Sequence, residues 1–160
     1  MKIKNLAILS VAVAALFACT KPAPVEEPLA PEANYQGTVN VNLTNGDLFT
    51  LDEVKVNITV SEDGQTADII MYQVKLAPRM PQLDITIPGV QLSQNGRVLT
   101  CEETIPLALG GEFTNYKVTG LTGTRSEEEL SFSLKFGSTP TSFTGVSVEE
   151  EEEELEGEEK

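Results

Sequence analysis

Residues 129–136 read Glu129-Leu130-Ser131-Phe132-Ser133-Leu134-Lys135-Phe136, a strict alternation of polar and apolar side chains. Successive side chains of a β-strand point to opposite faces, so this stretch predicts a strand with all four apolar side chains on one face. A slip of one residue would place that whole set in water, so the pairing register of the strand is well specified.

The same alternation recurs through the body of the chain. One apolar face consists of Val39, Val41 and Leu43, and another of Val54, Val56, Ile58 and Val60. The turn dipeptides Asn45-Gly46 and Asn95-Gly96 fall between such runs, and no stretch shows a sustained helical period. Strands are expected near residues 35–44, 48–60, 66–76, 82–87, 97–107, 115–122, 129–136 and 142–147.

Eight antiparallel strands at this spacing predict an all-β fold. The favoured architecture is a closed eight-stranded up-and-down barrel, and the alternative is a β-sandwich. Proline residues bracket the segment 82–87, so that strand is expected at a sheet edge.

The N-terminal segment has the features of a secretory signal peptide. A short head at residues 1–5, with Lys2 and Lys4, precedes a run of 12 mostly apolar residues, which is shorter than the roughly 20 that a membrane-spanning helix needs. The run ends at Leu16-Phe17-Ala18-Cys19, which resembles the lipobox of bacterial lipoproteins, although Phe17 is larger than the residue usual there. Residues 1–18 are therefore expected to be a lipoprotein signal peptide, with Cys19 carrying the lipid that anchors the protein.

Two polar segments flank the body at 34–148. Residues 19–33 are rich in proline and predict a semi-extended tether. Residues 149–160 hold nine Glu and one Lys, and like charges at this density predict a disordered, solvated tail. Clustered carboxylates suit Ca²⁺, but nothing in the tail fixes the roughly six to eight oxygens that such a site needs.

Net charge is distributed unevenly over these parts. The whole chain carries −14, the chain from Cys19 onward −16, and the body only −6. An acidic chain does not suit the phosphate backbone, so nucleic acid is not an expected partner.

Composition also argues against an enzyme. The chain contains no His, which removes Ser-His and Cys-His nucleophile pairs and His-bearing metal centres. Cys101 lies beside Glu102-Glu103, which disfavours a reactive thiolate, so a half-buried strand thiol is the favoured interpretation. Pairs such as Asp52-Glu53 point to opposite faces of a strand and are expected to be solvated. No catalytic residue, metal or cofactor is predicted.

One loop stands out as a candidate site. Pro78, Arg79, Met80 and Pro81 form a rigid and partly apolar segment between two expected strands. This loop is expected either to rim a barrel mouth or contact a partner, or simply to close one end of the barrel.

Several segments of the body carry a resemblance to a known family. They are Tyr35-Gln36-Gly37, residues 72–81, residues 83–90, Val118-Thr119-Gly120 and Phe143-Thr144-Gly145. With the lipobox, residues 34–147 resemble the calycin-like β-barrel domain of secreted lipoproteins from gut Bacteroidota. The resemblance implies an eight-stranded barrel related in architecture to lipocalins, and it implies no reaction. The Gly-x-Trp motif that opens true lipocalins is absent, because the chain contains no Trp.

The functional expectation is a non-catalytic binding module held at the outer membrane by Cys19, on its periplasmic face or at the cell surface. Its ligand would be a small apolar molecule or an envelope protein, since eight strands leave room for side chains or for one small ligand. The alternative is a structural or interaction lipoprotein with a solid core, acting in a surface assembly.

Overall fold

The computed structural model describes residues 26–149. The predicted signal peptide, the predicted lipidation site Cys19, residues 19–25 of the predicted tether and the tail beyond Glu149 lie outside these residues.

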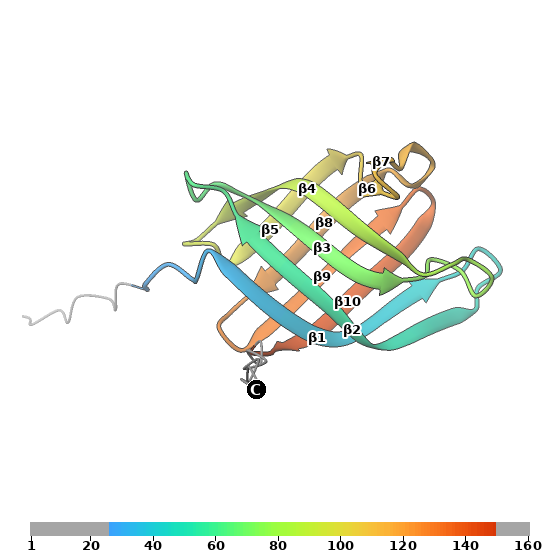
Figure 1. The fold of residues 1–160 in the computed structure, drawn as a ribbon, viewed down its shortest axis with the longest axis horizontal. Coiled ribbons are helices and arrows are strands. Elements are labelled where there is room, and N and C mark those ends of the chain that lie inside the picture. The colour runs from blue at the N-terminus through green and yellow to red at the C-terminus, as the bar shows by residue number, and fades with distance from the viewer. Residues whose placement is uncertain (1–25, 150–160) are drawn as a thin grey trace, which may run out of the picture.

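Eight long strands form an antiparallel meander in which each pairs with the next along the chain (Figure 1). They are β1 (Glu32–Asn42), β2 (Leu48–Val60), β3 (Thr66–Val74), β4 (Leu83–Ser93), β5 (Val98–Thr104), β8 (Val118–Arg125), β9 (Glu129–Phe136) and β10 (Thr139–Ser147). The last strand pairs with the first, from Tyr35 opposite Ser147 to Val41 opposite Thr141, which closes the sheet into a barrel. The predicted eight-stranded up-and-down barrel is confirmed, and the sandwich alternative is not what forms.

Three short elements interrupt the meander between β5 and β8. They are β6 (Leu107–Ala108), β7 (Gly111–Glu112) and the 3-10 turn η1 (Thr114–Tyr116). The β6 strand pairs with β4 and with β7, so this small hairpin continues the wall beside β4 beyond the point where β5 leaves it.

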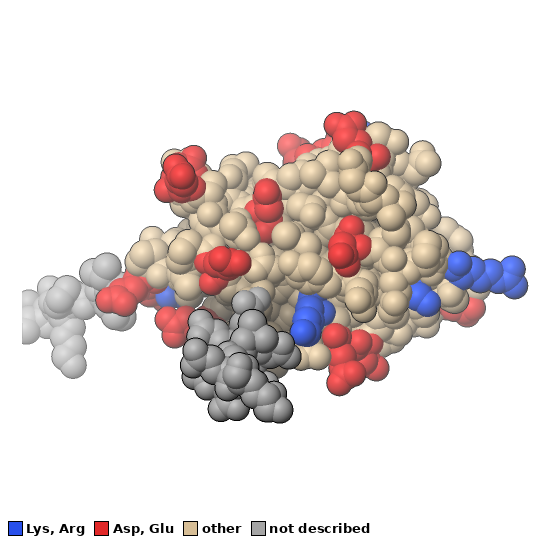
Figure 2. Space-filling model, viewed as in Figure 1, with Lys and Arg blue, Asp and Glu red and all other residues tan. Residues whose placement is uncertain are grey.

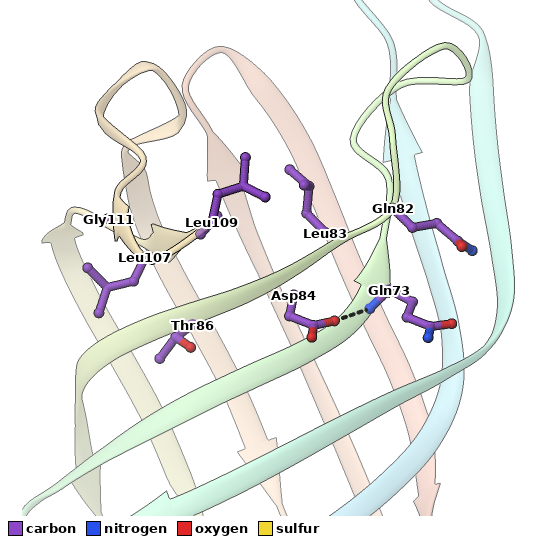
Figure 3. Close-up of a pocket in the computed structure, with 10 residues that line it drawn as sticks. Gln73, Gln82, Leu83, Asp84, Thr86, Leu107, Leu109 and Gly111 are labelled. Carbon is purple, nitrogen blue, oxygen red and sulfur yellow. Dashed lines mark hydrogen bonds between the residues drawn. The ribbon is translucent and has the colours of Figure 1, made fainter.

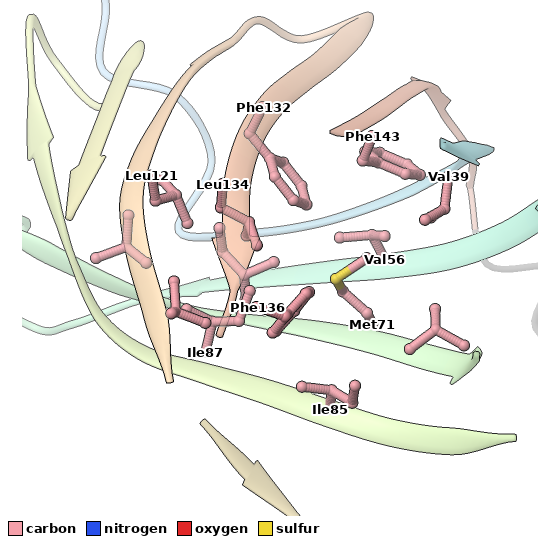
Figure 4. Packing of buried hydrophobic residues seen from close by; sticks show 14 of the residues in the cluster. Val39, Val56, Met71, Ile85, Ile87, Leu121, Phe132, Leu134, Phe136 and Phe143 are labelled. Carbon is pink, nitrogen blue, oxygen red and sulfur yellow. The ribbon is translucent and has the colours of Figure 1, made fainter. Parts of the chain in front are cut away.

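The interior of the barrel is filled by apolar side chains from every wall. All four inward residues predicted for β9 are buried, with Phe136 at 1% exposure and Leu134 at 4%. The ring centroids of Phe132 and Phe143 lie 5.3 Å apart on neighbouring strands, and Met71 points toward them from another wall (Figure 4). Each such side chain contributes about 1.5–3 kcal/mol when it leaves water, so this core is the main source of stability.

The two ends of the barrel hold different turns and loops, and both described termini lie at one of them (Figure 1). The terminal end contains residues 26–31, the turns 61–65, 94–97 and 126–128, and Val148. The far end contains the turns 43–47 and 137–138, the loop 75–82 and the segment 105–117.

The expectation that the strand at 82–87 is an edge strand is wrong. β4 runs from Leu83 to Ser93 and pairs on both sides, because a closed barrel has no edge there. Pro88 lies between the β6 and β5 pairings, and Gly89 adopts φ +70° in a bulge against β3. The Asp68 carboxylate accepts the Gly89 N–H at 3.0 Å, so the proline falls where the ladder needs no donor from it.

Candidate functional site

The candidate site is a hollow of about 850 Å³ on the outer wall of the barrel at the far end (Figure 3). It lies between β4 on one side and the β6–β7 hairpin on the other. Its lining combines polar side chains from the β3–β4 wall with leucines from the hairpin: Gln73, Gln82, Leu83, Asp84, Thr86, Leu107, Ala108, Leu109, Gly110 and Gly111.

A bulge builds the polar wall of the hollow. The β3–β4 register shifts between Met71 and Val74, and Gln73 adopts φ +53°. The Asp84 carboxylate accepts the Gln73 N–H at 2.9 Å, as the dashed line in Figure 3 shows. This hydrogen bond fixes the bulge and keeps the Gln73 side chain on the outside of the barrel.

The other wall is the β6–β7 hairpin, which is anchored at its base. Pro106 is buried, and its carbonyl accepts the Phe113 N–H at 2.7 Å. The ring of Phe113 stacks on Tyr116 with centroids 4.5 Å apart, and both pack against the core. The base is therefore rigid, while the tip projects from the barrel.

The tip of this hairpin displays apolar side chains to solvent. Leu109 is 84% exposed and Leu107 is 41% exposed. The turn places Leu109 at φ +55° and Gly110 at φ +79°, and a two-residue turn with both φ values positive favours Asn-Gly. Leucine at the first of these positions is strained, and it gains no burial in return.

Sequence reasoning missed Leu107 and Leu109. The strand expected near residues 97–107 ends at Leu107, and the sequence prediction assigns no element to residues 108–111. The available signal was a leucine directly before Gly-Gly, where a hairpin tip is normally polar.

The predicted loop Pro78–Pro81 lies at the far end, between β3 and β4. Met80 is partly buried against the core, and its N–H donates to the carbonyl of Ala77 at 3.0 Å. Pro78, Arg79 and Pro81 are exposed. None of the four lines the 850 Å³ hollow, although the next residue, Gln82, does.

A buried arginine lies at the terminal end. Arg125 is only 3% exposed, and its Nη2 donates to the carbonyl of Ala30 at 2.6 Å. Its Nε and Nη1 have no hydrogen-bond partner among the described residues. Burial lowers the pKa of Arg125, and the nearby Tyr35 hydroxyl opposes that shift. The Tyr35 hydroxyl itself donates to the carbonyl of Ser126 at 2.9 Å.

Other candidate groups lie apart from the hollow. Cys101 is buried in β5, and burial raises the pKa of its thiol. Asp52, Glu53, Glu102 and Glu103 are exposed. Within residues 26–149, no group of three Cys, Asp or Glu side chains is arranged to hold a metal ion. The described residues also include no helix long and apolar enough to cross a membrane.

Comparison of the chain with protein-family models, curated proteins and solved structures gave no match.

Proposed function

We propose that this chain is a lipid-anchored envelope protein of the calycin-like group that acts as a non-catalytic interaction module. Its barrel holds the hairpin tip at the far end, and a partner protein binds there. The lipobox at residues 16–19 and the resemblance of the body support the anchor and the group. The exposed, strained Leu109 supports the interaction, and it is the observation that carries the proposal.

The filled interior favours a protein partner over a small apolar ligand. The most prominent hollows in the described part of the chain open on its outer surface, and each takes at most two lining residues from the buried set. A small-molecule site normally encloses most of its ligand in an apolar cavity of a few hundred Å³. The alternative of a solid-core interaction lipoprotein therefore becomes the leading one.

The chemistry of the hollow fits an extended peptide segment of the partner. One wall is lined by Gln73, Gln82, Asp84 and Thr86, residues whose polar groups can bond to a peptide backbone. The other wall offers Leu107 and Leu109 for an apolar side chain. Contiguous exposed apolar side chains beside a groove are typical of a protein–protein contact.

Leu109→Asn tests this function directly. A photo-crosslinking amino acid is placed at Gln82, which lies in the hollow opposite the hairpin, and the full chain is illuminated in intact envelopes. The expected result is one discrete crosslinked product, which Leu109→Asn abolishes. Asn suits the left-handed backbone of this turn, so the thermal midpoint should stay equal or rise.

The matched control is Val146→Asn, because Val146 is 57% exposed on β10 near the terminal end. This variant should leave the product intact. A product that survives Leu109→Asn, or no discrete product at all, would refute the proposed function.

A further inference from the structure

The first described residues form a strap across the terminal end, which is defined here as residues 26–31. The strap is held by Asn95 and Arg97 of the 94–97 turn and by β2. The Asn95 side-chain amide donates to the Glu26 carbonyl at 2.9 Å, and the Val60 N–H donates to the Pro31 carbonyl at 2.7 Å.

Two arginines make further contacts with the strap. Arg97 Nε lies 3.0 Å from the Glu26 carboxylate, and Arg97 Nη2 donates to the Glu27 carbonyl at 3.2 Å. The buried Arg125 donates to the Ala30 carbonyl at 2.6 Å. The Arg97–Glu26 pair is exposed and weak by itself, but five of the six strap residues are bonded to the barrel, Leu29 among them through its N–H to the Asn95 carbonyl at 3.4 Å.

Docking of the strap shortens the reach of the chain from Cys19. Between Cys19 and Glu26 the chain can span at most about 25 Å, whatever its conformation. Without the strap contacts, the free length would extend to Glu32 at the start of β1, and the span would be about 45 Å. At roughly 3.3 Å per residue the barrel strands of 7 to 13 residues are about 23 to 43 Å long, so only the longer span exceeds the length of every strand and lets the barrel turn over freely.

We propose that the strap sets the orientation of the barrel at the membrane, with the terminal end facing the lipid surface and the far end facing away. The inference rests on the proposed lipid anchor at Cys19. It places the Leu109 tip where a partner can approach from the side opposite the membrane.

Charge at the terminal end fits a face that stands near lipid without adhering to it. Exposed acidic residues crowd its turns: Glu62, Asp63, Glu127 and Glu128, with Glu149 following β10. On the face shown in Figure 2, the visible basic side chains lie mostly toward the centre and the opposite end. Anionic lipid would repel such a face within about 10 Å at ordinary ionic strength, so the strap, and not adhesion, holds the orientation.

The experiment uses the full chain, lipidated in a bacterial host and inserted in phosphatidylcholine vesicles that carry a headgroup quencher. A fluorophore is attached to Gln65→Cys at the terminal end or to Ser138→Cys at the far end, both at exposed positions. The label at 65 should be quenched severalfold more than the label at 138.

The first part of the strap is then released with Asn95→Gly and Arg97→Ala, which together remove the three contacts to Glu26 and Glu27 and leave those of Leu29, Ala30 and Pro31 in place. Glycine suits position 95, where φ is +58°. The difference between the two labels should shrink, because the free length from Cys19 then extends past Glu27. The control is Lys117→Ala, which breaks the 3.0 Å ion pair with Glu103 at the far end and should leave the difference unchanged.

Equal quenching of the two labels in the vesicle-bound wild type would overturn the orientation while leaving the anchor intact, as would an unchanged difference after the strap is released. A chain that carries no lipid by intact mass and stays off the vesicles would overturn the anchor, and the orientation with it.

Discussion

The hydroxyl of the buried Tyr35 makes the stability of the folded barrel depend on pH. Tyr35 is 1% exposed, and burial raises the pKa of its hydroxyl, while the charge of Arg125 works in the other direction. A raised pKa means that the folded chain keeps the proton while the unfolded chain loses it. The contribution of the Tyr35 hydroxyl to the free energy of unfolding is therefore fully present below the ordinary pKa of 10.0. It is lost as pH rises from there through the higher pKa of the folded chain.

Tyr35→Phe should therefore change the alkaline stability profile. At neutral pH the variant loses the hydrogen bond to Ser126 and should be less stable by about 0.5–1.5 kcal/mol. As pH rises above 10, the difference in stability between wild type and variant should narrow, because only the wild type must keep the Tyr35 phenol protonated to stay folded. Urea unfolding at several pH values measures it, with Tyr72→Phe as the control at a 39% exposed phenol. A difference that is the same at every pH would show that the Tyr35 hydroxyl is not coupled to folding.

At the scale of the strand pair, closure of the barrel depends on two glycines that face each other. Gly37 of β1 lies opposite Gly145 of β10. A Cβ added at Gly37 would lie 2.3 Å from the Gly145 Cα, and one at Gly145 would lie 2.5 Å from the Phe143 ring. These are backbone and core contacts that cannot move aside cheaply, so the seam requires small residues on both sides.

Gly37→Ala should destabilise the barrel by about 1–3 kcal/mol or more, because the β1–β10 seam must open to admit the methyl group. The measurement is the urea midpoint, together with amide hydrogen exchange of β1 and β10. Gly64→Ala in the 61–65 turn is the comparison, because a Cβ there meets no atom within 4 Å and only the positive φ of +71° resists it. Faster exchange should appear in the seam for Gly37→Ala and stay local to the turn for Gly64→Ala. Unchanged exchange in β1 and β10 would refute this account of the seam.

The elements that could be predicted are those whose pattern is local. β9 alternates without interruption and β2 alternates on either side of a bulge at Glu53, and their predicted bounds of 129–136 and 48–60 match the structure. β4 could not be placed correctly, because Pro88 is tolerated only where the β6 and β5 pairings leave a gap. The hairpin tip at Leu109 and the docked strap depend on contacts between distant parts of the chain, such as Arg97 with Glu26, and sequence spacing does not reveal them.

At the scale of the whole molecule, the interior of the barrel is occupied by the apolar side chains that stabilise the fold. A closed eight-stranded barrel can hold one small ligand inside, but here large apolar side chains from several walls pack together in the centre (Figure 4). The interaction proposed above would then take place on the outside, at loops and hairpins that the barrel holds in position. The same packing makes the interior sensitive to loss of volume, and that sensitivity offers a direct test of the filled core.

Phe136→Ala should convert the solid barrel into one with a dry apolar cavity. The loss of this 1% exposed ring should cost about 3–5 kcal/mol, and Leu134→Ala about 2–5 kcal/mol if the first variant is too unstable to purify. An apolar cavity of this kind stays empty of water and binds small aromatic molecules. Benzene should therefore raise the thermal midpoint of the cavity variant and leave that of the wild type unchanged, with Leu48→Ala, at a 61% exposed position, behaving like the wild type.

Native mass spectrometry of the wild type after exposure to a lipid extract should likewise show no retained molecule. A retained lipid, or a rise in the thermal midpoint of the wild type with benzene, would contradict the filled core and indicate that the interior is a ligand site.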